Sequence, residues 1–97
     1  MFIVTVSYTA PLDEVNQWRR AHGEWLTDLV ARQLLLMAGR RPEWVGGVYL
    51  VPGMPSEEID RLLATDPYLL NGVAEHQVVE FTPLLVAPGL EELKARG

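Results

Sequence analysis

Two histidines are the side chains in this sequence best suited to move a proton near neutral pH, and His22 is the more informative of them. At about 100° per residue it lies within an apolar helical stripe with Val15, Trp25 and Leu29, so its imidazole is expected to face the interior. A buried imidazole needs partners for its ring nitrogens. Two interpretations stay open: a core histidine bonded to a backbone carbonyl, or a histidine in a functional site.

Asp66 stands directly before Pro67, which is typical of a helix N-terminus where an aspartate caps the first turn and a proline follows it. Capping alone would explain this residue. His76 alternates with Ala74 and Val78 on one side of the last predicted strand. It either approaches a site between sheet and helices or is a half-exposed strand histidine.

The residue inventory excludes several kinds of chemistry. The chain has no cysteine, so thiol nucleophiles, thiolate metal ligands and disulfides are absent. No serine-nucleophile motif occurs. A metal site made from His22 and His76 with Asp66 or Glu75 is a weaker alternative, because the spacings typical of zinc enzymes are missing. We therefore expect no metal ion and no other cofactor.

Three further residues are candidates for contacts with a small molecule. Ser7 and Tyr8 end the first predicted strand, where their hydroxyls could donate into a cleft, although such hydroxyls are more often structural. Trp44 lies in the loop Arg40–Trp44, and we expect it at a subunit interface or on the wall of a cleft. Trp18 and Trp25 are expected in the core.

Composition and charge fit one globular domain. Of the 97 residues, 48% are hydrophobic and 22% are charged, which excludes a disordered chain. The net charge of -5 disfavours nucleic acid and anionic membranes as partners, and the doublets Arg19-Arg20 and Arg40-Arg41 are expected to be solvated surface. We find no signal-peptide pattern and no apolar run long enough to span a membrane, and expect a cytoplasmic protein.

The hydrophobic patterns predict an α+β order. Strands are predicted at Phe2–Tyr8, Val45–Val51 and Val73–Thr82, and helices at Leu12–Leu36, from Ser56 onward and around Asp66–Asn71. The first helix could instead stop near Ala31 and give way to a short strand, because periodicity does not separate the two. Gly46 and Gly47 indicate a bulge or a close approach of two backbones.

This order matches a split β-α-β ferredoxin-like fold, in which helices cover one face of an antiparallel sheet. We expect one domain over residues 1–97. Because the core is thin and the strands are apolar on both faces, the second face is expected to pack against another subunit, which gives a homodimer with a barrel-like assembly. The extension 83–97 is too small to fold alone, and we expect it to dock on the domain or on the partner subunit.

Several segments resemble the YciI-like (YCII-related) family. The stretch from Ala64 to Val78, with its aspartate-proline-aromatic turn, glycine and last strand, is similar to that family's C-terminal signature. His22 stands where the family carries a histidine in its first helix. Leu36–Gly39 resembles the family's short strand ending in glycine, and Gly46–Val51 the strand after it. The resemblance covers Phe2 to Thr82.

The resemblance implies a dimeric ferredoxin-like fold with a histidine and an aspartate as the proposed active site in a cleft. On this chain those residues are His22 and Asp66. A relative of known activity eliminates halide from a chlorinated, hydroxylated aromatic ring, while most members have no assigned reaction. A carboxylate bonded to one imidazole nitrogen fixes the tautomer and makes the other nitrogen a better base, which suits elimination, isomerisation or proton transfer.

The sequence departs from the family in the loop Arg40–Trp44, which replaces a small turn and a polar insert, and in its longer tail after Pro83. Two functions are compatible with these residues and with the resemblance. The first is a small cytoplasmic enzyme that uses His22 and Asp66 for acid-base chemistry, and the second is a non-catalytic dimeric module that binds a small molecule or a protein. For the enzyme, the candidate substrate contacts are Ser7, Tyr8, His76 and Trp44. An open cleft that reaches both members of the pair favours the enzyme, and a sealed pair favours the module.

Overall fold

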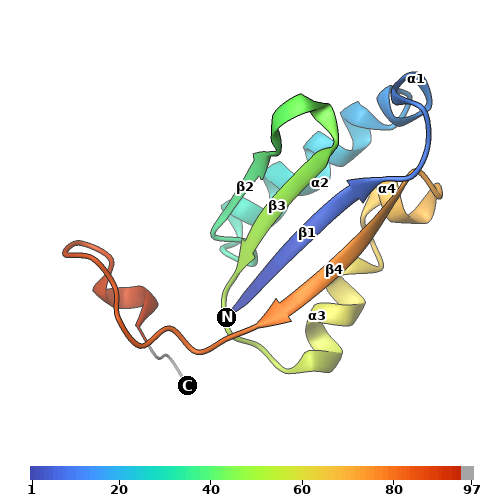
Figure 1. Ribbon diagram of the computed structural model, residues 1–97. Coiled ribbons are helices and arrows are strands. Elements are labelled where there is room, and N and C mark those ends of the chain that lie inside the picture. The colour runs from blue at the N-terminus through green and yellow to red at the C-terminus, as the bar shows by residue number, and fades with distance from the viewer. Residues whose placement is uncertain (95–97) are drawn as a thin grey trace.

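The computed structural model describes residues 1–94, which contain one four-stranded antiparallel sheet. Its strands are β1 (Phe2–Tyr8), β2 (Met37–Arg40), β3 (Gly46–Val51) and β4 (Ala74–Glu80), and they lie in the order β2-β3-β1-β4 (Figure 1). The central strand β1 pairs with both β3 and β4. The predicted α+β, ferredoxin-like layout is therefore confirmed, with each helical crossover passing over one intervening strand.

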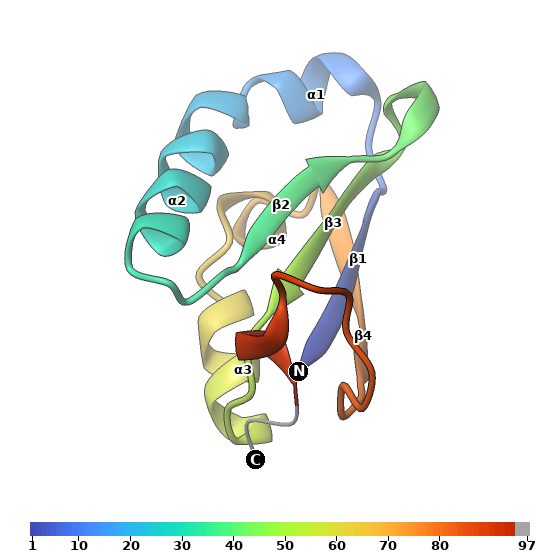
Figure 2. The same ribbon diagram turned by 90° about the vertical axis from the view of Figure 1, so that its left-hand side faces the viewer.

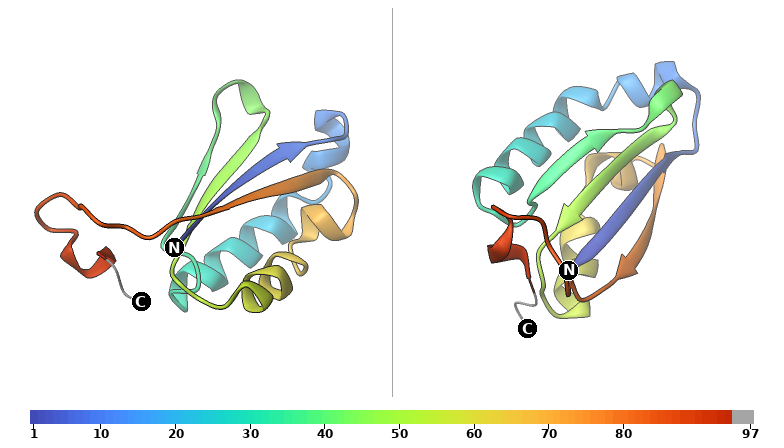
Figure 3. Two further views of the ribbon diagram at one scale, coloured as in Figure 1. Left: turned by 60° about the horizontal axis from the view of Figure 1, so that its bottom comes forward. Right: turned by 60° about the vertical axis from the view of Figure 1, so that its left-hand side comes forward.

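Four α-helices occur within residues 1–94, namely α1 (Leu12–Asn16), α2 (Arg19–Ala31), α3 (Ser56–Leu63) and α4 (Pro67–Leu70). Figure 3 shows them on one side of the sheet. The core lies between the two layers, where Phe2, Val4 and Val6 of β1 alternate toward the helices and are at most 2% exposed. Across the described part of the chain, no helix is both long and apolar enough to cross a membrane.

The single long helix predicted for residues 12–36 is wrong. α1 and α2 are separated at Gln17 and Trp18, and Trp18 has non-helical backbone angles of φ -107° and ψ 3°. Trp18 is 36% exposed and is not the core residue that we expected, whereas Trp25 packs against the core. The alternative prediction is confirmed, because α2 ends at Ala31 and a short strand follows.

Gln33 sets the end of α2 by adopting a left-handed backbone conformation with φ 60°. The amide of Leu34 then donates to the carbonyl of Leu29, and Leu35 enters the core. This is the helix closure that a glycine usually supplies. It redirects the chain into β2 without any glycine at the turn.

The face of the sheet opposite the helices carries apolar side chains from all four strands. We call it the open face and define it by the residues Ile3, Met37, Val48, Leu50 and Val79, which the strand register places on one side. Met37 and Val79 are each 59% exposed. A monomer therefore leaves a connected apolar surface in contact with water.

Beyond β4 the chain leaves the sheet. The amino group of Met1 donates to the carbonyl of Phe81, and the following segment extends away from the domain before a short 3-10 turn at Glu91–Leu93 (Figures 1 and 2). Leu84 and Leu85 in this segment are 68% and 92% exposed. The end of the predicted extension, residues 95–97, lies outside the described residues.

The two glycines that begin β3 mark a close approach of backbones, as the sequence predicted. A Cβ added to Gly46 would lie 1.8 Å from the carbonyl oxygen of Val6, and one added to Gly47 would lie 2.7 Å from the carbonyl oxygen of Gly39. Both obstacles are backbone atoms of neighbouring strands. The pairing of β3 with β1 and β2 therefore requires residues without side chains here.

Replacing Gly46 by Ala is expected to lower the free energy of unfolding by about 3 kcal/mol or more, because the new methyl group meets backbone in the central strand. Gly23→Ala in α2 is the matched control. No atom lies within 4 Å of a Cβ at position 23, so this change should leave stability equal or raise it by about 1 kcal/mol. Urea denaturation of both variants measures the difference. Equal stabilities would contradict the steric argument.

Candidate functional site

Asp66 is positioned by the start of α4. Its backbone is extended, Pro67 is the first helical residue, and Oδ1 of Asp66 accepts the amide of Tyr68 at 2.9 Å. The predicted N-cap is therefore confirmed. The Asp66 side chain is also fully buried, so its remaining acceptor capacity must be met inside the protein.

Helix α2 brings His22 to this carboxylate. Nδ1 of His22 lies 2.8 Å from Oδ1 of Asp66. The imidazole stacks on the ring of Tyr68, with centroids 3.8 Å apart and planes 9° from parallel, and the side chain is 12% exposed. Of the two interpretations left open for His22, the structure places a carboxylate, and not a backbone carbonyl, beside the imidazole.

The second oxygen of Asp66 accepts two further hydrogen bonds. The hydroxyl of Tyr49 on β3 donates to Oδ2 at 2.9 Å, and Nε2 of His76 on β4 lies 2.9 Å from the same oxygen. One buried carboxylate therefore has four hydrogen-bond partners, which come from α2, α4, β3 and β4. Sequence reasoning missed Tyr49, although its position on the helix-facing side of a strand was the available signal.

The surroundings of Asp66 keep it ionised. Burial alone would raise the pKa of its carboxyl, but the hydrogen bonds from His22 and His76 outweigh burial and hold this pKa well below its usual range. Burial, with the charge of Asp66 and the hydrogen bond to it, raises the pKa of Tyr49 far above that of a free tyrosine. Tyr49 is thus a neutral donor beside a carboxylate.

The two histidines differ at their second ring nitrogen. Nδ1 of His76 is buried without a hydrogen-bond partner among residues 1–94, so a proton added there would find no acceptor. Nε2 of His22 lies 3.4 Å from the hydroxyl oxygen of Tyr49. Because the one hydroxyl proton of Tyr49 points to Asp66, this oxygen can accept from a protonated Nε2. Within residues 1–94, His22 thus differs from His76 in having an oxygen near its second ring nitrogen.

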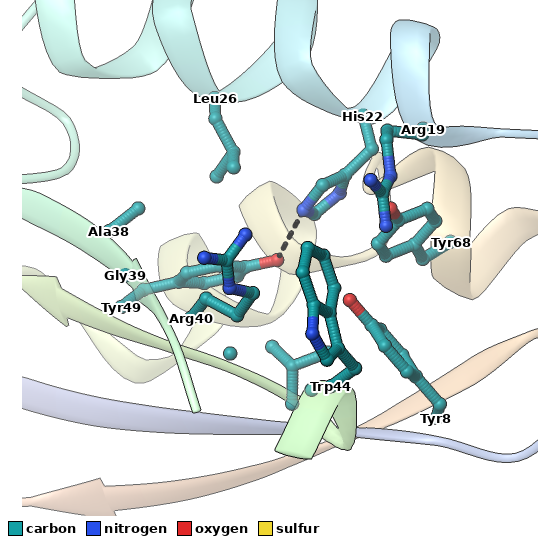
Figure 4. A pocket seen from close by; sticks show the side chains of 13 residues that line it. Tyr8, Arg19, His22, Leu26, Ala38, Gly39, Arg40, Trp44, Tyr49 and Tyr68 are labelled. Carbon is teal, nitrogen blue, oxygen red and sulfur yellow. Dashed lines mark hydrogen bonds between the residues drawn. The ribbon is translucent and has the colours of Figure 1, made fainter. Parts of the chain in front are cut away.

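A cavity of about 330 Å³ opens beside His22 (Figure 4). Tyr8 and Trp44, two of the expected ligand contacts, line it, as do Tyr49 and Tyr68. Asp66 lies behind His22 and does not reach the cavity wall. The cavity therefore offers a ligand one nitrogen of the imidazole and several aromatic surfaces.

Two other expected contacts are not brought to this cavity. Ser7 lies on the side of β1 away from the helices, and its Oγ accepts from Nη1 of Arg41 at 3.0 Å. His76 is bonded to Asp66 and is not part of the cavity wall. Strand alternation explains Ser7, because neighbouring residues on β1 face opposite sides.

Arg19 and Arg40 were expected to be solvated surface, and both line the cavity. Arg19 precedes His22 by three residues on α2, which puts the two side chains on one face of the helix. That spacing was the signal that sequence reasoning passed over. Within residues 1–94, no group of three histidine, aspartate or glutamate side chains is arranged to hold a metal ion.

Comparisons with known proteins agree with this fold. Eight chains of solved structures match, among them the 5-chloro-2-hydroxyhydroquinone dehydrochlorinase (TftG) from Burkholderia phenoliruptrix AC1100 in complex with 2,5-dihydroxybenzoquinone. The likeness has a TM-score of 0.70 at 16% sequence identity and covers 86% of this chain and 95% of that one. At this identity it shows a shared fold. The search of the curated proteins gave no match.

A family model gives the stronger assignment. The model of the YCII-related domain matches residues 1–82, which include all four strands, all four α-helices and the residues around Asp66. Because the match covers most of the sequence, this chain belongs to the YCII-related domain family.

Proposed function

We propose that this protein is a small enzyme in which His22 moves a proton on a small molecule bound in the cavity, and Asp66 orients the imidazole. One observation carries the proposal. Nδ1 of His22 contacts a buried, ionised carboxylate, while the ring borders an open cavity. A carboxylate fixes the tautomer that leaves Nε2 able to accept a proton.

The surroundings also provide hydrogen-bond acceptors for the protonated imidazole that such a step produces. When Nε2 of His22 takes a proton from the ligand, the imidazolium donates at Nδ1 to Asp66 and at Nε2 to the oxygen of Tyr49. Return of that proton to another atom of the ligand gives an isomerisation, and loss of a leaving group gives an elimination. General acid-base catalysis by one side chain contributes roughly 10²–10⁴-fold to such rates.

The comparison supports this class of reaction. The dehydrochlorinase with the same fold carries a small cyclic molecule in its complex, and its name describes an elimination. By analogy of fold, this chain would also act on a small molecule. We propose no metal ion and no other cofactor in this step.

A non-catalytic binding module is the second candidate, and one observation favours it. Asp66 is sealed behind His22 and ties four elements together, which is also what a purely structural carboxylate would do. Of the pair, His22 borders the cavity and Asp66 is buried. Measurement of proton transfer distinguishes the enzyme from the binding module.

We further propose that two copies pair through the open face. Its apolar residues come from all four strands, and Leu84 and Leu85 in the segment after β4 are exposed apolar side chains as well. Burial of such a surface would remove the apolar contact with water that a monomer leaves. The extension 83–97 would then dock on the partner or on the domain itself.

Val48 lies near the middle of the open face, and Val48→Asp is expected to convert a dimer into a monomer because it buries an unpaired charge at the interface. Val30→Asp is the control, since Val30 is 41% exposed on α2 and lies outside the open face. Sedimentation velocity at micromolar concentration gives the oligomeric state. A monomeric parent protein would contradict the pairing.

The carboxyl carbon of Asp66 is expected to show no titration as pH falls to about 3, because the hydrogen bonds from His22 and His76 hold the pKa of this carboxyl well below its usual range. Asp66 therefore stabilises the fold fully above its unfolded pKa of 3.8, and this contribution is lost as pH falls further, through the lowered folded pKa. Carbon-13 NMR follows this carboxyl carbon directly. Titration of Asp66 at pH 3.8 or above would contradict the lowered pKa.

His22→Asn is expected to abolish proton transfer and keep the fold. The measurement is deuterium exchange from solvent into small molecules that carry an acidic C–H bond, followed by NMR, and the loss should be about 100-fold or more. Stability should fall by about 1 kcal/mol, because asparagine loses the stack on Tyr68. His76→Asn is the matched control, with a histidine on the same carboxylate but outside the cavity wall.

Three outcomes decide between the functions. Loss of exchange in His22→Asn with retention in His76→Asn supports catalysis by His22. Unchanged exchange in folded His22→Asn removes His22 as the base. A parent protein that binds these molecules and exchanges none of their protons is a binding module.

A further inference from the structure

The charged side chains on the cavity wall are all potential cations. Arg19, Arg40 and His22 line the cavity, and no aspartate or glutamate does. Within residues 1–94, neither arginine forms an ion pair with a carboxylate, whereas Arg20 next to Arg19 pairs with Glu24. In a chain of net charge -5, this cavity is a local region of positive charge. Such a region attracts small anions.

The ring of Trp44 contacts the guanidinium groups of both Arg19 and Arg40. The Cζ atom of Arg40 lies 3.9 Å from the centre of the Trp44 ring system and that of Arg19 lies 5.2 Å from it. Figure 4 shows Trp44 between the two arginines at the mouth of the cavity. Stacking uses the flat face of a guanidinium and leaves its N–H edges available for an anion.

The loop that carries Trp44 is held in an unusual conformation. Glu43 and Trp44 are consecutive non-glycine residues with φ 67° and 59°, an arrangement that costs of order 1–3 kcal/mol for each residue. Arg41 anchors the loop, because its amide donates to the carbonyl of Gly46 and its Nη1 donates to Val6 and Ser7. Left-handed non-glycine residues held by such contacts are found at ligand sites.

Resting on the function proposed above, we propose that the cavity selects a small planar anion, with its charged oxygen at the free N–H edges of Arg19 and Arg40, its plane along the aromatic side chains of the cavity wall and its acidic hydrogen toward Nε2 of His22. An unsaturated carboxylate with an acidic C–H next to the carboxylate group belongs to this class. When the C–H bond breaks, the proton goes to Nε2. The electron pair of the C–H bond forms a C=C bond to the carboxylate carbon, and a second negative charge develops on the carboxylate oxygens, where the arginines stabilise it.

Salicylate, salicylamide and cyclohexanecarboxylate test the charge and the planarity separately. In isothermal titration calorimetry, salicylate should bind at least about tenfold more tightly than its neutral amide and than the non-planar acid. Arg19→Gln and Arg40→Gln should each weaken salicylate about tenfold or more and leave the amide unchanged. Arg20→Gln is the matched control and should change neither, since Arg20 is 94% exposed and pairs with Glu24.

Trp44→Leu should weaken salicylate as well, because the guanidinium groups lose the ring that positions them. Thermal melts of each variant establish that it is folded. Equal binding of salicylate and salicylamide to the parent protein would overturn the proposal, and so would salicylate binding that both folded arginine variants retain. Absence of salicylate binding at millimolar concentration would overturn it too.

Failure of this proposal is distinguishable from failure of the proposed catalytic function. His22→Asn leaves both arginines and Trp44 in place, so it should still bind salicylate even where proton exchange is lost. Selective anion binding in a parent protein that exchanges no protons would remove catalysis and leave the anion cavity. Proton exchange with neutral molecules, without selective anion binding, would remove the anion cavity and leave the catalytic function.

Discussion

The structure depends on the hydrogen bonding of one buried charge. An ionised carboxylate taken out of water loses several kcal/mol of hydration, which must be returned by donors inside the protein. Asp66 receives them from the amide of Tyr68, from two histidines and from Tyr49. Each donor belongs to a different place in the chain, so this requirement holds α2, α4, β3 and β4 in one arrangement.

The same requirement explains why the two histidines are not equivalent. Both contact Asp66, but the strand β4 faces its histidine into the core, while α2 presents His22 along the edge of a cavity. The stack of His22 on Tyr68 also helps to orient the imidazole, and Tyr68 directly follows Asp66 and Pro67 at the start of α4. The helix cap and the orientation of the imidazole are therefore parts of one local structure.

Much of the fold could be predicted from the sequence, since period-two strands and the glycines of β3 are local signals. The break at Trp18 and the left-handed Gln33 could not, because neither residue type usually ends a helix and tertiary packing determines both conformations. At the candidate site, His22 and Asp66 were predicted through position and resemblance, and the structure brings the two side chains into contact. Tyr49 and the arginines were missed, because only the crossing of β3, α2 and the Arg40–Trp44 loop brings them to one cavity.

The anchoring of the Arg40–Trp44 loop by Arg41 separates two parts of the molecule. Nη1 of Arg41 donates to Val6 and Ser7 on the central strand, whereas Glu43 and Trp44 take no part in the strand pairing. The hydrogen-bond partners around Asp66 come from elsewhere, namely from α2, β3, β4 and the cap of α4. A change in this one short loop would therefore reshape the wall of the cavity and leave the hydrogen bonds around Asp66 in place.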